Sequence, residues 1–351
     1  MIRGRNTGIV AALAAAALFG AGTPLAKLLL AHASPWLLAG LLYLGSGAGL
    51  WLLRRLRRAP TVQMARSDWS WLAGAILAGG IAGPVLLMVG LSMMPASGTS
   101  LLLNAEGVFT ALLAWFAFGE NVDRRVALGV TAIVAGVLVL GWPQQAQFAG
   151  AGPVLAVLGA CLAWAIDNNL TRKVSLTDAS FIAMTKGLVA GCTNLALALA
   201  TGAHWPGAAT VTGAALLGFA SYGASLVLFV IGLRHLGTAR TGAYFSVAPF
   251  FGAVLAIVLL GEPVTLPLLV AALLMAIGVG LHLTERHEHE HTHLPLAHSH
   301  MHLHAAGDDH HDHEHDAPVA PGTRHAHWHR HAATTHAHPH FPDAHHRHSH
   351  R

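Results

Sequence analysis

Charged residues are scarce in this chain. Asp, Glu, Lys and Arg make up 10% of the 351 residues, whereas 54% are hydrophobic and the mean hydropathy is +0.53. A soluble domain cannot bury that much apolar surface in one core, so we predict a polytopic membrane protein. The sequence also lacks a nucleotide-binding loop and any grouping of nucleophile, base and oxyanion-stabilising residues, which argues against an enzyme.

Cysteine is equally rare. Cys161 and Cys192 both fall within apolar segments and form no disulfide framework, zinc motif or redox pair. The formal net charge of +4 does not indicate nucleic-acid binding, because Lys and Arg occur in short clusters between apolar segments. We therefore expect a lipid bilayer and a small-molecule or ion substrate as partners, no nucleic acid, and a monomer or homodimer.

Apolar segments of the length that a bilayer requires recur along the chain and predict an all-α fold of ten transmembrane helices. The first begins like a secretory signal, but its apolar run extends through Leu25 to Leu30 past any cleavage point, so we interpret it as a span. The ten segments are residues 8–30, 35–53, 70–93, 97–118, 125–142, 152–172, 179–201, 209–233, 240–260 and 264–283.

Basic residues lie on one side of these predicted spans. With a cytoplasmic N-terminus, only Lys27 goes against the rule that Lys and Arg collect in cytoplasmic loops. This asymmetry predicts a multi-pass protein of the plasma membrane, the inner membrane in a bacterium, with both termini cytoplasmic. The residues that then face the cytoplasm are Arg54, Arg55, Arg57, Arg58, Arg66, Arg124, Arg125, Arg172, Lys173, Arg234 and Arg240.

The chain contains an internal duplication. A shift of 142 positions (262 − 120 = 142) places Gly119-Glu120 on Gly261-Glu262 and Gly90-Leu91 on Gly232-Leu233. Each half has five predicted spans, an odd number, so the halves should be inverted in the membrane, as in many secondary transporters. The predicted domains are residues 1–142, 143–284 and a tail at 285–351.

An acidic residue lies in the middle of the fourth predicted span. An ionisable side chain at the depth of Glu106 is a functional candidate, because it is costly there. With no partner in its own helix, Glu106 should favour the neutral acid, and a carboxyl that takes up and releases a proton suits proton-coupled transport. The alternative is a structural hydrogen bond to another helix.

A second polar group lies on the sixth and seventh predicted spans. Trp164, Asp167 and Asn168 share one helical face. Asp167 and Lys186 are almost equally distant from the turn between the two spans, so they should lie at the same depth and can pair, either as a structural ion pair or to hold a substrate. The candidate substrate-binding residues are Asn104, Trp164, Asp167, Asn168, Lys186, Tyr244 and Ser246.

Other features have local interpretations. Gly79-xxx-Gly83 and Gly187-xxx-Gly191 predict close helix packing, and Pro24, Pro84 and Pro249 predict kinks. Glu120 and Glu262 each end a span after a glycine. A carboxylate there opposes the helix dipole, so we expect a turn contact or a gate.

The tail holds 23 of the 27 histidines (27 less His32, His204, His235 and His282) and few large apolar residues, so we expect it to be disordered. Imidazole and carboxylate groups suit Zn, Ni, Co and Cu, and a divalent metal on the tail is the one cofactor we consider; transport itself requires none. The candidate metal ligands are His287, His289, His291, His293, His298, His300, His302, His304, His310, His311, His313 and His315.

The patterns GLSMMPASGTSLLLNAEGVFTALLAWFAFGE and GLRHLGTARTGAYFSVAPFFGAVLAIVLLGE, in two five-span halves, resemble the EamA group of the drug/metabolite transporter superfamily over about residues 8–283. The resemblance implies a basket of helices around a central cavity, with the fourth and ninth spans near the symmetry axis, and export or exchange of small metabolites. Where the second repeat has Pro249, the first has Gly107 beside Glu106.

Three hypotheses follow. The first is a secondary transporter that exports a small polar metabolite, with proton coupling through Glu106. The second is an exporter of divalent transition metal ions that the tail collects in the cytoplasm. The third is a membrane sensor that does not transport and uses the tail as a metal- or pH-responsive switch.

Overall fold

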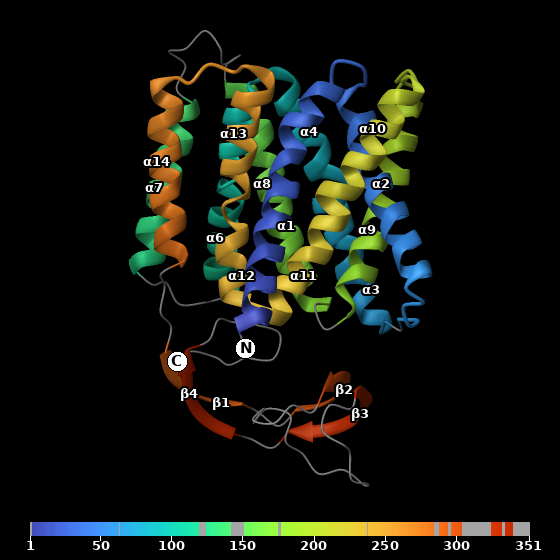
Figure 1. Cartoon of the computed structure of the whole chain (residues 1–351), viewed down its shortest axis with the longest axis vertical. Coiled ribbons are helices and arrows are strands. Elements are labelled where there is room, and N and C mark those ends of the chain that lie inside the picture. Colours follow the sequence, from blue (N-terminus) through green and yellow to red (C-terminus); the bar gives the residue numbers. More distant parts are fainter. Residues whose placement is uncertain are drawn as a thin grey trace. The chain divides into compact units, whose positions relative to one another are not determined.

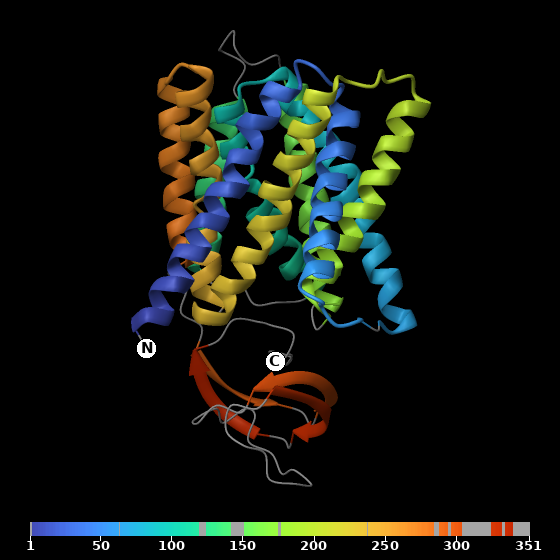
Figure 2. The same ribbon diagram turned by 45° about the vertical axis from the view of Figure 1, so that its right-hand side comes forward.

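A computed structural model describes most of the chain and divides it into two units, Met1–Glu285 and Arg286–Arg351. The first unit is a bundle of long, nearly parallel helices (Figures 1 and 2). The described residues are 2–62, 64–118, 124–141, 151–174, 177–236, 238–283, 288–293, 296–303, 324–331 and 334–339.

The helices of the first unit follow the predicted apolar segments. Those of the first half are α1 (Ile2–Leu29), α2 (Pro35–Leu56), α3 (Arg66–Ala75), the π-helix η1 (Ile76–Ala82), α4 (Gly83–Met93), α5 (Ala96–Leu102), α6 (Ala105–Phe118) and α7 (Arg124–Gly141). Those of the second half are α8 (Ala151–Thr171), the 3₁₀ turn η2 (Arg172–Val174), α9 (Ala179–Ala200), α10 (Ala208–Gly218), the π-helix η3 (Phe219–Ala224), α11 (Ser225–Leu236), α12 (Thr238–Phe245), α13 (Ala248–Leu260) and α14 (Leu266–Leu283).

Among the described residues, six helical segments are long and apolar enough to cross a membrane and three apolar helices are shorter, so the chain is a multi-pass membrane protein. The number of ten spans stays a prediction. The six segments are Asn6–Leu29, Pro35–Leu56, Arg66–Met93, Ala151–Thr171, Ala179–Ala200 and Ala208–Gly232, and the shorter helices are Ala127–Gly141, Ala248–Leu260 and Leu266–Leu281.

Two of the predicted spans, residues 97–118 and 240–260, are each divided into two helices by a short turn. The first breaks between α5 and α6, where the Asn104 amide donates to the Leu101 carbonyl oxygen at 2.9 Å and competes with the helical bonding pattern. The second breaks between α12 and α13, where Pro249 stands in the first turn of α13 and has no backbone N–H to give.

The helix boundaries repeat with the 142-residue shift. Adding 142 to the first residue of α5 and to the last residue of α6 gives the first residue of α12 and the last residue of α13. The same addition carries α7 onto α14 at both ends, and the two π-helices onto each other within one residue. The equivalent elements α3 and α10 lie at opposite ends of the bundle, as do α4 and α11 (Figures 1 and 2).

Packing between the halves follows the same symmetry. Helix α1 packs against α11 and α13, and its equivalent α8 packs against α4 and α6. Helices α2 and α9 approach until a β-carbon at Gly187 would lie 2.7 Å from the Gly47 Cα, and one at Gly191 would collide with the Leu44 backbone. The predicted close packing at Gly187 and Gly191 is therefore confirmed.

The described residues of the second unit form four short strands, in the tail for which the sequence predicted disorder. They form two antiparallel pairs, β1 with β4 and β2 with β3. The reason lies in the alternating pattern of the tail, since a period of two places every second residue on the same face of an extended chain. The strands are β1 (Glu288–His293), β2 (Leu296–Leu303), β3 (Arg324–His331) and β4 (Thr334–Pro339).

Candidate functional site

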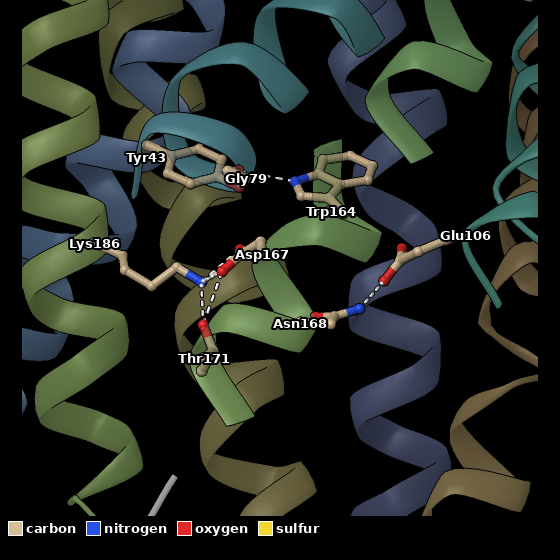
Figure 3. A network of polar contacts seen from close by, with 8 residues as sticks. All are labelled: Tyr43, Gly79, Glu106, Trp164, Asp167, Asn168, Thr171 and Lys186. Atoms are coloured by element: carbon tan, nitrogen blue, oxygen red, sulfur yellow. Dashed lines mark hydrogen bonds and ion pairs between the residues drawn. The ribbon is translucent and has the colours of Figure 1, made fainter. Parts of the chain in front are cut away.

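The predicted pair between Asp167 and Lys186 is present. The Lys186 Nζ donates to Asp167 Oδ1 at 2.6 Å and to Oδ2 at 2.5 Å, which joins α9 to α8 (Figure 3). The Thr171 hydroxyl, one turn further along α8, donates to Asp167 Oδ1 at 2.8 Å. Both charged side chains are largely buried, with 7% of the Asp167 side chain and 17% of the Lys186 side chain exposed. The two opposite charges therefore cancel, and the pair carries no net charge inside the bundle.

The next residue of α8 contacts the acid singled out by the sequence. The Asn168 amide nitrogen donates to Glu106 Oε1 at 2.8 Å, across from α8 to α6 (Figure 3). Asn168 is exposed and Glu106 partly exposed, and a β-carbon at the neighbouring Gly107 would meet no atom within 4 Å. Glu106 is thus less buried than Asp167.

The Gly79 carbonyl accepts two hydrogen bonds at the same site. The indole of Trp164 and the hydroxyl of Tyr43 each donate to it at 2.9 Å. The π-helix η1 explains why this oxygen is available. The Gly83 N–H bonds the Ala78 carbonyl, five residues back, so the donor next in line for Gly79 is Pro84, which has no N–H.

The glycines of the Gly79-xxx-Gly83 pattern make room for the polar site. A β-carbon at Gly79 would overlap the Asp167 carboxylate, and one at Gly83 would lie 2.9 Å from the Trp164 indole nitrogen. The sequence predicted helix packing here. The close contacts at these glycines are instead made with the side chains of the site itself.

Asn194 of α9 is a further polar residue of the site. Its amide nitrogen donates to the Gly80 carbonyl at 3.1 Å, and its Oδ1 accepts from the Trp36 indole at 3.2 Å. Its partners come from two other helices, Trp36 from α2 and Gly80 from η1, so no spacing in the sequence indicates them.

Aromatic side chains continue from the site into the second half. Tyr43 packs against Tyr222 with ring centroids 5.5 Å apart, Tyr222 against Phe19 at 5.8 Å, and Phe19 against Phe245 at 5.4 Å. All four are partly exposed. They form an apolar row beside the polar groups, and no spacing in the sequence indicates it because they come from α1, α2, η3 and α12.

Three predicted binding residues lie outside this network. Asn104 is buried at the break before α6, with its amide also 3.9 Å from the Met275 sulfur. Tyr244 lies near the end of α12, and Ser246 lies in the turn before α13. The site that the structure brings together therefore contains Trp164, Asp167, Asn168, Lys186 and Glu106 from the predicted set.

Glu262 and Lys27, the two residues whose positions ran against the sequence rules, both have hydrogen-bond partners in the fold. The Glu262 carboxylate accepts from the N–H groups of Ala96 at 2.6 Å and Ser97 at 2.8 Å, and so caps α5 from the other half. Lys27 donates to the Leu91 and Met94 carbonyl oxygens at the end of α4. The prediction of a turn contact holds for Glu262, while Glu120 lies outside the described residues.

The predicted metal ligands are only partly described. His289, His291 and His293 lie on β1, and His298, His300 and His302 lie on β2. Within the described part of the chain, no group of three or more His, Cys, Asp or Glu residues is placed to hold a metal ion. The candidates that lie outside the described residues are His287, His304, His310, His311, His313 and His315.

Several known proteins are similar to this chain. An uncharacterized transporter of Methanothermobacter thermautotrophicus is 26% identical over 295 residues, covering 78% of this chain and 85% of the relative. A probable 4-amino-4-deoxy-L-arabinose-phosphoundecaprenol flippase subunit ArnE of Pseudomonas fluorescens is 36% identical over 106 residues, 30% of this chain and 90% of the relative. A probable amino-acid metabolite efflux pump of Escherichia coli is 33% identical over 82 residues, 23% of this chain and 27% of the relative.

A solved crystal structure shares the fold, with a TM-score of 0.58 and 18% identity over 79% of this chain and 96% of the solved one. The repeated helical bundle with ionisable groups in its interior defines a multi-pass membrane transporter of small substrates. The EamA-like transporter family matches residues 6–142 and 152–284, and the chain belongs to this family of drug/metabolite transporters.

Proposed function

We propose that the protein is a secondary active transporter that exports a small polar metabolite and couples this movement to protons through Glu106. The observation that carries the proposal is the contact between Glu106 and Asn168 beside the Asp167–Lys186 pair. The described ion pairs are Arg54–Asp178 and Lys186–Asp167, and Glu106 takes part in neither. An uncompensated carboxylate at this depth is costly, which favours exchange of its proton.

The Asn168 side chain suits both protonation states of Glu106. Its NH₂ group donates to the carboxylate, and after a rotation of the amide its carbonyl oxygen accepts from the protonated acid. Protonation of Glu106 therefore changes which group Asn168 offers to its other neighbours. Because Asn168 and Asp167 are consecutive on α8, the change reaches a helix that also holds the ion pair.

The substrate we infer carries an amino group. Asp167 offers an anionic partner once Lys186 moves away, and the aromatic row from Tyr43 to Phe245 offers an apolar wall. Two relatives, a probable amino-acid metabolite efflux pump and a probable 4-amino-4-deoxy-L-arabinose-phosphoundecaprenol flippase subunit, support this choice. We place the protein in the plasma membrane with both termini in the cytoplasm, on the evidence of the basic residues.

Transport in proteoliposomes tests the coupling role. Glu106→Gln keeps the shape and hydrogen bonds of the side chain but cannot exchange a proton, whereas Glu106→Asp keeps a titratable group. We expect Glu106→Gln to lose uphill transport driven by a pH gradient and to keep downhill exchange, and Glu106→Asp to keep part of the uphill activity. Uphill transport by the Glu106→Gln protein at the normal rate would overturn the proposal.

We also propose that the tail binds a divalent metal, which bears on the second hypothesis, export of metal ions. The strand register supports it: His298 is paired with His329, His300 with His327 and His302 with His325. Directly opposed residues of an antiparallel pair have β-carbons about 4.5–5.5 Å apart, within reach of one ion.

A metal-tolerance assay separates the remaining hypotheses. Cells that carry the full chain, a chain ending at Thr284, or a deletion are grown with Ni, Co, Zn or Cu. Export of metal predicts sensitivity in the deletion strain and partial sensitivity with the shortened chain. Unchanged tolerance in all strains removes metal export, and a metal- or pH-responsive sensor requires that the purified protein moves no solute in proteoliposomes.

A further inference from the structure

A cavity of about 220 Å³ lies between α2, the start of α9 and α11, away from the Glu106 site. One wall is aliphatic, formed by Leu226, Val227, Val230 and Ile231 of α11. The other carries Arg54 of α2, Arg57 directly after α2 and Asp178 at the start of α9. The cavity therefore combines an apolar wall with a charged end.

The two arginines differ in their contacts. Arg54 has three hydrogen-bond partners within the protein. Its guanidinium donates to Asp178 Oδ1 at 2.8 Å, to the Ser180 hydroxyl at 2.5 Å and to the Pro60 carbonyl oxygen at 3.1 Å. Arg57 is exposed, and the described ion pairs do not include it. With two arginines and one aspartate, the formal charge of the lining is +1 (2 − 1 = 1).

Two tryptophans indicate the depth at which the cavity lies in a bilayer. Trp51 lies one helical turn before Arg54, is 47% exposed, and has the Arg55 guanidinium carbon 5.4 Å from its ring centroid. Trp71 on α3 is 42% exposed, with the Lys173 Nζ 5.9 Å from its ring centroid. Exposed tryptophan beside basic residues is typical of the headgroup level of a bilayer, where lipid phosphates lie.

We propose that this cavity is a binding site for an anionic phospholipid of the cytoplasmic leaflet. The phosphate pairs with Arg57, whose guanidinium fork matches phosphate oxygens, and the start of an acyl chain lies along the aliphatic wall of α11. A free anion would use the arginine but not the four aliphatic side chains. A zwitterionic lipid would use the aliphatic wall but would bring its own cation to the arginine.

The test uses the purified full chain in detergent and native mass spectrometry, with phosphatidylglycerol, phosphatidylcholine or inorganic phosphate added. We expect saturable binding of one phosphatidylglycerol that phosphatidylcholine does not match and inorganic phosphate does not displace. Arg57→Gln should weaken this binding about fivefold, which corresponds to about 1 kcal/mol. Val230→Trp, which fills the cavity, should also weaken it.

Arg66→Gln is the matched control, because it removes the same charge from an exposed residue outside the cavity on the same predicted side. It should leave binding within about twofold, since only a general surface effect remains. Equal loss in Arg57→Gln and Arg66→Gln, displacement by inorganic phosphate, or equal binding of phosphatidylcholine would each overturn the proposal. None of these outcomes depends on Glu106, so the transport proposal is tested separately.

Discussion

Asp167 and Asn168 are consecutive residues of α8 whose side chains reach two different helices. Asp167 binds Lys186 of α9, and Asn168 binds Glu106 of α6 (Figure 3). One turn of α8 therefore carries both Asp167 of the ion pair and Asn168, the hydrogen-bond partner of Glu106. A movement of this turn changes both contacts.

Breaking the ion pair from one side should be costly. Asp167→Asn or Lys186→Met leaves a buried charge without its partner, and we expect a loss of about 3–5 kcal/mol in the free energy of unfolding for each. The double variant removes both charges and should lose less than either single variant. Denaturant unfolding in detergent measures the three changes.

The double variant also separates a structural role from substrate binding. If the pair only joins α8 to α9, transport returns with stability in the double variant. We expect stability to return while transport stays lost, because we assign Asp167 to the substrate. Normal transport by the double variant would contradict that assignment.

Two glycines should respond in opposite ways to one added methyl group. Gly79→Ala places a β-carbon on the Asp167 carboxylate, so we expect both a lower melting temperature and loss of transport. Gly107→Ala meets no atom within 4 Å, and alanine favours a helix over glycine by up to about 1 kcal/mol. Gly107→Ala should therefore be neutral or stabilising, and a comparable loss in both variants would contradict the lack of close neighbours at Gly107.

Asn194 of α9 donates to the Gly80 carbonyl of another helix. Asn194→Leu removes this donor, which should cost about 1–3 kcal/mol in the free energy of unfolding. Thr193→Val is the neighbouring control, because its hydroxyl bonds its own helix at Val189. Denaturant unfolding in detergent measures both changes, and a similar loss in both variants would mean that the cost does not come from the Gly80 carbonyl.

The Arg54–Asp178 contact should stabilise the protein only above acidic pH. Partial burial of Asp178 raises its pKa, but hydrogen bonds from Ser180 and the Phe181 N–H, together with Arg54, outweigh it and lower the pKa below the usual value. A carboxyl with a lowered folded pKa stabilises above its unfolded pKa of about 3.9, and that contribution disappears as pH falls through the folded pKa.

Melting temperatures of the wild-type chain and of Asp178→Asn should therefore differ at pH 5–7 and converge as the pH falls below about 4. The difference will be modest, because 40% of the Asp178 side chain is exposed. Asp68→Asn serves as the control for removal of a partly exposed negative charge on the same predicted side. A difference that persists unchanged at low pH would mean that the asparagine alters the helix start and not the ionic contact.

Much of the bundle could be predicted because it depends on residues that are near each other in the chain. The length of the apolar segments predicted the helices, and the 142-residue shift predicted two halves whose helix boundaries coincide. The pairing of Asp167 with Lys186 followed from their equal distance to one short turn. Such predictions need only helix geometry and the chain between two residues.

The remaining features depend on partners far away in the sequence. A hydropathy profile cannot detect the break at Asn104, since the segment is apolar on both sides of it. It cannot detect the π-helix at Gly79 either. The Glu262 carboxylate opposes the dipole of its own helix. Its position is explained by the hydrogen bonds that it accepts at the start of α5, more than 160 residues earlier in the chain. The aromatic row draws its rings from α1, α2, η3 and α12, which only the tertiary fold brings together.

The breaks before α6 and before α13 are placed at equivalent positions in halves that run in opposite directions. Their surroundings differ, because one half has Glu106-Gly107 where the other has Ala248-Pro249. The two halves therefore supply a second backbone conformation for each other, because each half can be rebuilt on the backbone of the other. We expect the rebuilt molecule to be an alternative conformation of the protein, and its geometry can be calculated without any additional template.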